Sequence, residues 1–245
     1  MGNTDEKLCG LCNVRKIWAK GFCGACYKKQ VRAGKLDIKK RGTSPSTLTQ
    51  LQRDVLTASM LGDGFLSGRY KNAVLRINRS RKDKEYLLWE FEIFKDFCDS
   101  PAREYSRFHK KQQKTYHSSF FETRASSAFN EFREKWYING IKDVPPDLEL
   151  SPLIIAIWLC DDGCFLFRDG RPYRIKFATC AFSKEATTTL AEKLSAFVDA
   201  DFTIQKHEGG YSIVGSVVAA RKLLLLIKDF IPSSMKRKIE KWVIR

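Results

Sequence analysis

"LTASMLGDGF", residues 56–65, and "IAIWLCDDGCF", residues 155–165, share one pattern: an apolar stretch that ends on Asp-Gly. Around the first stretch, apolar residues at positions 48, 51, 55, 56 and 60 recur at helical spacing, and the second stretch is apolar along most of its length. Each stretch predicts a helix that delivers a carboxylate, Asp63 or Asp162, just before a glycine. A single Asp-Gly pair is more often a turn than a catalytic site, so the repetition is the informative feature.

From about residue 46 onward, the pattern of the chain predicts a duplication. The two Asp-Gly pairs lie 99 residues apart, and each is followed by a lysine that opens the next expected helix, Lys84 or Lys184. Helical and alternating segments follow in the same order in both halves, with a helix expected over 126–140 at the end of the first. Ser151 and Pro152 are the expected N-cap and first turn of the second motif helix. We therefore predict an α+β fold of two pseudo-symmetric αββαββα repeats. The alternative is a chance similarity between two unrelated α+β stretches.

Composition and charge restrict the class of protein. The chain carries a formal net charge of +16, and such an excess favours a polyanionic partner, most commonly nucleic acid. The alternative is a basic protein with no polyanionic partner. No apolar run approaches the roughly 20 residues needed to span a bilayer, and the start "MGNTDEK" is unlike a signal peptide. We expect an intracellular protein, cytoplasmic or organellar, without a membrane partner.

Four of the eight cysteines, Cys9, Cys12, Cys23 and Cys26, form a C-x2-C-x10-C-x2-C pattern. Two such knuckles can offer four thiolates in a tetrahedron, which suits a structural Zn²⁺ that supplies folding energy to a segment too small for a core. Ordinary buried or redox-active thiols are the alternative. A basic and aromatic segment follows and suits phosphate contact, unless it is a solvated tail, and residues 41–47 form an expected linker.

The two Asp-Gly helices predict a catalytic metal site if they pack side by side about a pseudo-twofold axis. Asp63 and Asp162 would then be neighbours at two electronegative helix C-termini, where two carboxylates are costly without a cation. Paired carboxylates that hold Mg²⁺ or another divalent cation can activate water and stabilise a phosphodiester displacement.

"LTASMLGDG" resembles the LAGLIDADG motif of homing endonucleases, and "IAIWLCDDG" resembles the second copy in their single-chain, two-motif members. The resemblance spans about residues 48–240. The cysteine segment resembles the zinc ribbons attached to phage and intron-encoded nucleases. The resemblance implies two antiparallel sheets in a saddle over double-stranded DNA. It also implies a monomer that binds a long target site and hydrolyses phosphodiester bonds in both strands with divalent metal. A cleavage-deficient RNA maturase or DNA-binding regulator is the alternative.

The resemblance implies particular roles for individual residues. The last acid of each motif, Asp63 and Asp162, would bind the metal, and Asp161 competes with Asp162 for the role. A basic residue from the later strands would assist near the water or the phosphate: Lys206 in the second repeat, and Lys114 or Arg124 in the first. Each could equally be a plain exposed strand residue.

The expected domains are a zinc-binding basic module (1–42), a first repeat (43–147) and a second repeat (148–245). Alternating charged and apolar residues in the expected strands would present one sheet face to DNA. The predicted DNA-contacting residues are Arg76, Asn78, Arg81, Arg103, Arg107, Lys114, Arg124, Arg174 and Lys176. The cysteines outside the zinc pattern, Cys98, Cys160, Cys164 and Cys180, are expected in the core.

Overall fold

The computed structural model describes residues 7–36, 43–68 and 70–240, which form two compact units divided between Thr43 and Ser44. The small unit contains one helix, α1 (Gly24–Arg32), after two isolated bridges, Leu8↔Lys16 and Ala19↔Phe22. The basic run at 37–42, which includes part of the expected linker, lies outside the described residues. The units are described separately below.

The first half of the large unit contains one four-stranded antiparallel sheet in the order β1-β2-β4-β3. Thr49 begins the first motif helix with a capping box, in which Thr49 and Gln52 satisfy each other's backbone N–H groups. The elements are α2 (Gln50–Leu61), β1 (Phe65–Ser67), β2 (Val74–Ser80), η1 (Arg81–Asp83), α3 (Lys84–Phe94), η2 (Lys95–Phe97), β3 (Arg103–His109), η3 (Lys110–Gln112), β4 (Lys114–Glu122), η4 (Ser127–Phe129) and α4 (Asn130–Trp136).

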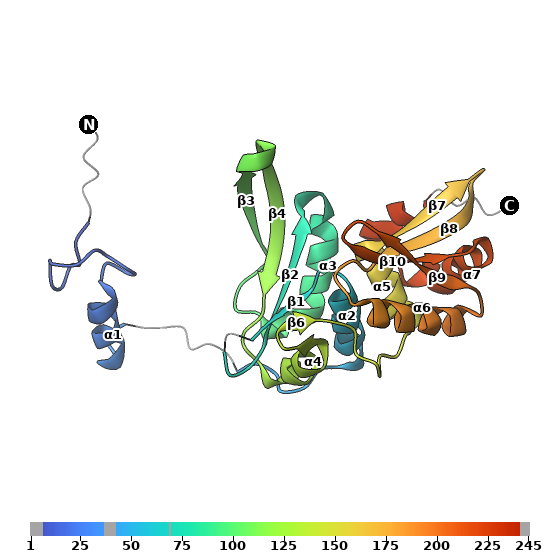
Figure 1. Cartoon of the computed structure of the whole chain (residues 1–245). Coiled ribbons are helices and arrows are strands. Elements are labelled where there is room, and N and C mark those ends of the chain that lie inside the picture. The colour runs from blue at the N-terminus through green and yellow to red at the C-terminus, as the bar shows by residue number, and fades with distance from the viewer. Residues whose placement is uncertain (1–6, 37–42, 69, 241–245) are drawn as a thin grey trace. The chain divides into compact units, whose positions relative to one another are not determined.

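The second half repeats this topology, with strands in the order β7-β8-β10-β9 (Figure 1). Ser151 caps the second motif helix, and Pro152 occupies its first turn as predicted. The elements are α5 (Pro152–Asp162), β7 (Gly163–Arg168), β8 (Arg171–Ala178), α6 (Lys184–Val198), β9 (Phe202–His207), β10 (Gly210–Gly215), α7 (Val217–Ile227), η5 (Lys228–Phe230) and η6 (Ser233–Lys238). The α+β fold with two antiparallel sheets is confirmed. The division into repeats at 147/148 stays a prediction, because residues 44–245 form one compact unit.

A short hairpin connects the two halves where the sequence predicted a longer helix. The helix expected over 126–140 ends at Trp136, and β5 (Tyr137–Ile138) pairs with β6 (Ile141–Lys142). Asn139 and Gly140 both have positive φ, 52° and 79°. An Asn-Gly pair of this conformation makes the two-residue turn that matches the twist of a hairpin.

The motif helices α2 and α5 pack against each other between the two sheets (Figure 1). Helix α5 is buried on all sides: Ile155, Ile157 and Leu159 are fully buried, and Trp158 stacks on Phe177 of β8. A helix that is apolar all round belongs in the centre of a domain. The packing of the two helices therefore brings both Asp-Gly ends close enough for their carboxylates to interact.

The prediction of core cysteines is correct for Cys160 and wrong for two others. Cys160 is buried in α5, whereas Cys164 and Cys180 are exposed and Cys98 is partly buried. Cys164 lies on the opposite face of β7 from the buried Phe165, because successive strand residues alternate between faces. In the described part of the chain, no helix is both long and apolar enough to cross a membrane.

Candidate active site at the helix seam

The ends of the two motif helices approach each other more closely than two ordinary side chains allow. A Cβ atom on Gly62, just after α2, would lie 2.4 Å from the Asp161 carboxylate in the last turn of α5. Only a glycine leaves room for this carboxylate. The sequence places Gly62 and Asp161 at equivalent motif positions, so the seam is asymmetric at its closest point.

The motif acids Asp63 and Asp162 stand in different surroundings. The Asp63 side chain is 59% exposed and accepts a hydrogen bond from Arg79 Nη1 at 3.1 Å. Asp162 is partly buried, and burial together with the charges of Asp63 and Asp161 raises its pKa to about 7. Three carboxylates thus share one electronegative region. Their mutual repulsion and oxygen donors fit a divalent cation between Asp63 and Asp162.

Asp161 is occupied by other protein groups. Its side chain is fully buried, and it accepts hydrogen bonds from Arg79 Nη2 at 2.9 Å and from the Tyr86 hydroxyl at 3.0 Å. Burial raises its pKa, and the Arg79 charge opposes that rise. Of the two adjacent acids, Asp162 is therefore the one available to a ligand.

Two lysines contact the backbone around the motif acids. Lys142 Nζ donates to the carbonyls of Gly62 and Gly64 at 2.8 and 2.9 Å, and Lys238 Nζ donates to the Gly163 carbonyl at 2.8 Å. Burial lowers the pKa of Lys142 to about 8, against the opposing attraction of Asp162, Asp63 and Asp161. A cation thus lies beside each motif end.

Neither lysine was among the predicted site residues. The available signals were "NG" before Lys142, which indicates a hairpin, and a lysine after the last helix of each half, in "GIKDVPP" and in "SMKRKI". Arg79 was also missed. It follows the buried Leu75 and Ile77 at a spacing of two, which places it on the inner face of β2.

The predicted basic residues Lys206 and Arg124 differ in their surroundings. Lys206 lies two residues after Ile204 in β9 and therefore on the same sheet face as Ile204 and its buried partner Ile213. Lys176 pairs with Val214, next to Ile213, and so lies on the opposite face. Arg124 follows β4, and its side chain is mostly buried. It donates to Ser44 Oγ at 3.0 Å and pairs with Asp99 at 2.9 Å. The role of Lys206 stays a prediction, and Lys238, which contacts the second motif end, is a further candidate basic residue of the second half. Arg124 is held in structural contacts.

The remaining predicted DNA-contacting residues lie mainly on the sheet faces turned away from the helices. Residues directly opposite each other in an antiparallel pair project to one face, so the β2-β4-β3 register groups five of them. The β8 register groups two more in the second sheet, and Arg81 is exposed in η1. The first five are Arg76, Asn78, Arg103, Arg107 and Lys114, and the next two are Arg174 and Lys176.

The model of the LAGLIDADG DNA endonuclease family matches residues 53–223, more than half of the chain. The chain belongs to this family. It is 26% identical to DNA endonuclease I-ChuI of Chlamydomonas applanata, over 79% of this chain and 96% of that protein. It is 28% identical to cytochrome b mRNA maturase bI2 of Debaryomyces hansenii, over 76% of this chain and 72% of that protein. The predicted family is thereby confirmed.

A solved LAGLIDADG structure supports the same fold. Homing endonuclease I-WcaI, determined bound to its DNA recognition sequence, superimposes with a TM-score of 0.74. The match covers 84% of this chain and 91% of that chain, at 22% sequence identity. The two-sheet arrangement of the large unit is therefore that of a LAGLIDADG endonuclease.

The small unit lies outside the family match and holds the four predicted zinc ligands. The Sγ atoms of Cys9, Cys12, Cys23 and Cys26 all lie within 4.8 Å of one another. Burial opposes ionisation of Cys9, but backbone N–H groups of Cys23, Leu11 and Cys12 lower its pKa to about 6. Such donors favour the thiolate that a metal requires. The donor set and its spacing fit Zn²⁺.

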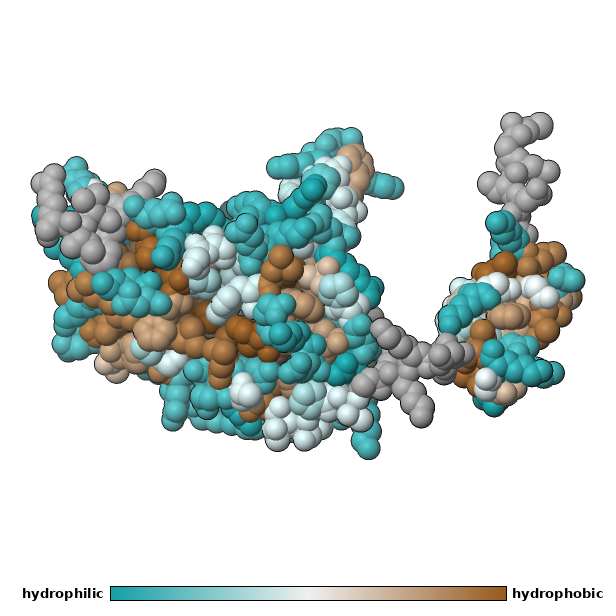
Figure 2. All heavy atoms as spheres, turned by 180° about the vertical axis from the view of Figure 1, so that it is seen from behind, coloured by the Kyte–Doolittle hydropathy of each residue, from teal (hydrophilic) through white to brown (hydrophobic). Residues whose placement is uncertain are grey.

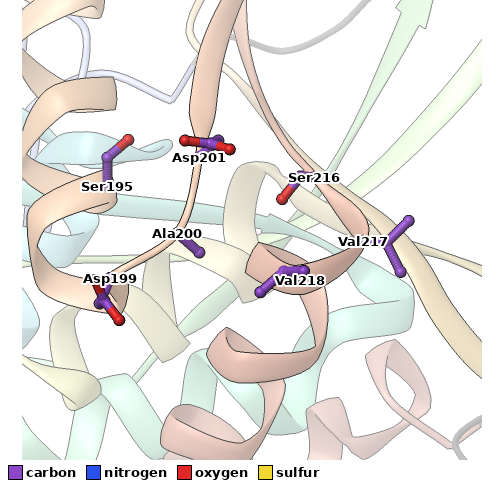
Figure 3. A pocket seen from close by; sticks show the side chains of 7 residues that line it. All are labelled: Ser195, Asp199, Ala200, Asp201, Ser216, Val217 and Val218. Atoms are coloured by element: carbon purple, nitrogen blue, oxygen red, sulfur yellow. The ribbon is translucent and has the colours of Figure 1, made fainter.

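A hollow in the second half of this LAGLIDADG fold does not belong to the site. Its lining residues come from the end of α6, the α6–β9 loop and the start of α7 (Figure 3). They are Ser195, Asp199, Ala200, Asp201, Ser216, Val217 and Val218. None of them comes from a motif helix, and Asp199 already pairs with Lys222 at 2.8 Å.

Proposed function

We propose that this protein is a site-specific double-strand DNA endonuclease. The observation that carries the proposal is the seam itself, where Asp63 and Asp162 end two packed motif helices with Lys142 and Lys238 beside them. Two acids with two flanking cations provide one catalytic set for each strand of a duplex. The family membership and the relative I-ChuI support the same function.

Asp63 and Asp162 would hold Mg²⁺ or another divalent cation. When bound, such a cation supplies Lewis acidity and lowers the pKa of water that attacks a phosphodiester. The protein contributes the position of the acids, fixed by the close approach of Gly62 to Asp161. Lys142 and Lys238, anchored on backbone carbonyls, can offset the negative charge that develops on the phosphate.

The sheet faces provide the DNA-binding surface in this proposal. The hairpin of β3 and β4 continues beyond the β2 pairing, which ends at Ser118 (Figure 1). Arg107 and Lys114 belong to this extension. Basic side chains there can contact phosphates and base edges along a long target. Because the chain supplies both motifs, we propose that it acts as a monomer, inside a cell and on chromosomal, organellar or phage DNA.

The zinc-binding module would extend the contact with DNA. Helix α1 ends with Lys29 and Arg32 in its last turn, and Trp18 contacts Tyr27 edge-to-face at 5.1 Å between ring centroids. Trp18 is 67% exposed, and apolar side chains cover part of this small surface (Figure 2). An exposed aromatic beside basic residues suits stacking on bases and contact with phosphates.

The test uses a plasmid library of randomised duplex sites incubated with Mg²⁺, with cut ends captured and sequenced to define the target. The wild-type protein is expected to cut both strands at one sequence. Asp63→Asn and Asp162→Asn should each slow cleavage by about 100-fold or more. Asp54→Asn, which changes a carboxylate on α2 outside the site, is the matched control. Full activity of either motif variant would refute the mechanism.

A maturase that binds RNA without cutting DNA is the second candidate function. The similarity to cytochrome b mRNA maturase bI2 over 76% of the chain favours it. It predicts tight, salt-sensitive binding of intron RNA and no metal-dependent cleavage of any library member. The library experiment and a filter-binding titration with intron RNA separate the two functions.

A further inference from the structure

A buried network of charged residues lies on only one side of the seam. The charged side chains of Arg79, Glu90 and Asp161 are all buried, with 4% exposure or less. Arg79 donates to Glu90 from Nε at 3.0 Å and from Nη2 at 2.7 Å, which is a two-bond fork. Its guanidinium also lies 4.9 Å from the centre of the Tyr86 ring.

Arg79 connects this network to the catalytic acid of the first motif. Arg79 Nη2 also donates to Asp161, which accepts a second hydrogen bond from the Tyr86 hydroxyl. Arg79 Nη1 donates to Asp63 Oδ2 at 3.1 Å. The guanidinium is planar and rigid, so bonds to Glu90 and Asp161 fix where the third bond points. The buried part of the network therefore orients an exposed carboxylate.

Within its described residues, the second half has no equivalent network. At the 100-residue spacing of Lys84 and Lys184, Arg79 corresponds to Thr179, which is also buried but carries no charge. At the same spacing, Tyr86 corresponds to Ala186 and Glu90 to Leu190. Apart from Asp161, which is itself bound to Arg79, the buried polar residues described in the second half are uncharged: Thr179, Thr187 and Ser212. Asp162 accordingly has no arginine clamp comparable to that on Asp63.

We infer that Arg79 is a positioning residue for Asp63. Because only the first motif acid has such a network, the two strands of the target are cut by two active sites of different construction. This inference rests on the proposed nuclease function. Loss of the clamp should slow the cut that depends more on Asp63 and leave the other cut largely unchanged. A merely structural arginine would affect both cuts equally.

The test measures the nicking rate constant of each strand on a duplex with two different end labels. Arg79→Lys keeps the buried positive charge but loses the fork, and we expect it to change the ratio of the two rate constants by about 10-fold. Arg53→Lys, which alters an exposed ion pair with Glu131 at 3.6 Å, is the matched control and should leave the ratio unchanged. A folded Arg79→Lys protein with the wild-type ratio, at any overall rate, overturns the inference.

A second variant covers the case in which Arg79→Lys does not fold. Tyr86→Phe removes only the hydroxyl that holds Asp161, leaves all charges in place, and should shift the ratio in the same direction by a smaller factor. An unchanged ratio in this variant also overturns the inference. A wild-type protein that cuts neither strand refutes the proposed function itself, whereas a cutting wild type with insensitive variants refutes only the role of Arg79.

A readout independent of cleavage is the side-chain NMR spectrum of the metal-free protein. The Nη1 protons of Arg79 should exchange slowly with water while Asp63 accepts from them, and this protection should be lost in Asp63→Ala. The Nε proton, held by Glu90, should stay protected in both proteins. Equal protection of Nη1 in the two proteins would contradict the clamp.

Discussion

At the scale of single residues, the site is a balance between carboxylates and a few buried cations. Burial raises the pKa of Asp162 and of Glu90 to about 7 in each case, with neighbouring carboxylates adding to the rise. Arg79 and Lys142 supply the compensating positive charge. The arrangement keeps Asp162 close to its protonation midpoint at neutral pH, so a cation can replace the proton at little electrostatic cost.

This balance predicts how the stability of the metal-free protein depends on pH. The unfolded Asp162 carboxyl has a pKa near 3.9 and loses its proton first, while the folded protein retains the proton up to about pH 7. The free energy of unfolding should therefore fall as the pH rises from about 4 to about 7.

Chemical denaturation between about pH 5 and pH 7 tests this dependence. In Asp162→Asn the fall should be smaller by on the order of 1 kcal/mol, allowing for solvent screening of a partly exposed group. Asp54→Asn should retain the wild-type slope. An equal slope in wild type and Asp162→Asn would show that Asp162 has an ordinary pKa in the folded protein.

At the scale of elements, the seam depends on one helix end that lacks a side chain. Gly62 has φ −104°, a value that any residue can adopt, so its importance comes from space alone. Added volume there must displace the buried Asp161 carboxylate from Arg79 and Tyr86.

We therefore expect Gly62→Ala to lower the free energy of unfolding by about 1–3 kcal/mol, as overpacking of a core does. It should also reduce cleavage by more than the loss of stability explains, because Arg79 would lose one of its anchors. Gly24→Ala is the control, since no atom lies within 4 Å of the added Cβ. Urea denaturation and cleavage rates of both variants check this. Wild-type stability in Gly62→Ala would contradict the close seam.

Sequence patterns were sufficient for elements with strong local signals. The period of the motif helices, the Ser151 cap and the alternation in the strands predicted the halves and their acids. They could not show that Glu90, inside an apolar helix, meets Arg79 on a strand, because the pairing exists only after packing. Lys142 was missed because an Asn-Gly turn was read as a helix end, and Lys206 was chosen without knowledge of its sheet face.

At the scale of the whole molecule, the chain joins a small unit built around four cysteines to a large unit with its own core. The small unit has two buried cysteines, Cys9 and Cys23, and exposes Leu8, Leu11 and Val14. Apolar burial on this scale does not stabilise a fold without a crosslink or a metal. The large unit contains a continuous core that includes both motif helices.

Removal of zinc should therefore unfold only the small unit. A strong chelator, or Cys12→Ser, is expected to collapse the amide signals of the small unit and leave the unfolding transition of the large unit in place. Cys164→Ser, an exposed cysteine outside the cluster, is the control. Atomic absorption should find one zinc per chain in the wild type. A metal-free protein with an unchanged small-unit spectrum would contradict the zinc assignment.

The contact between Gly62 and Asp161 also limits how this chain could be rebuilt as a symmetric dimer. Two copies of the second half, joined through their motif helices, would bring one Asp161 against the other with no arginine to separate the charges. Two copies of the first half would instead bring glycine against glycine and give each Arg79 its own Glu90. Only the first half is thus suited to stand as a homodimer. The second half needs Arg79 of the first half to balance the charge of Asp161. A design that exchanges halves between such nucleases must therefore transfer Arg79, Glu90 and Tyr86 together with any Asp161.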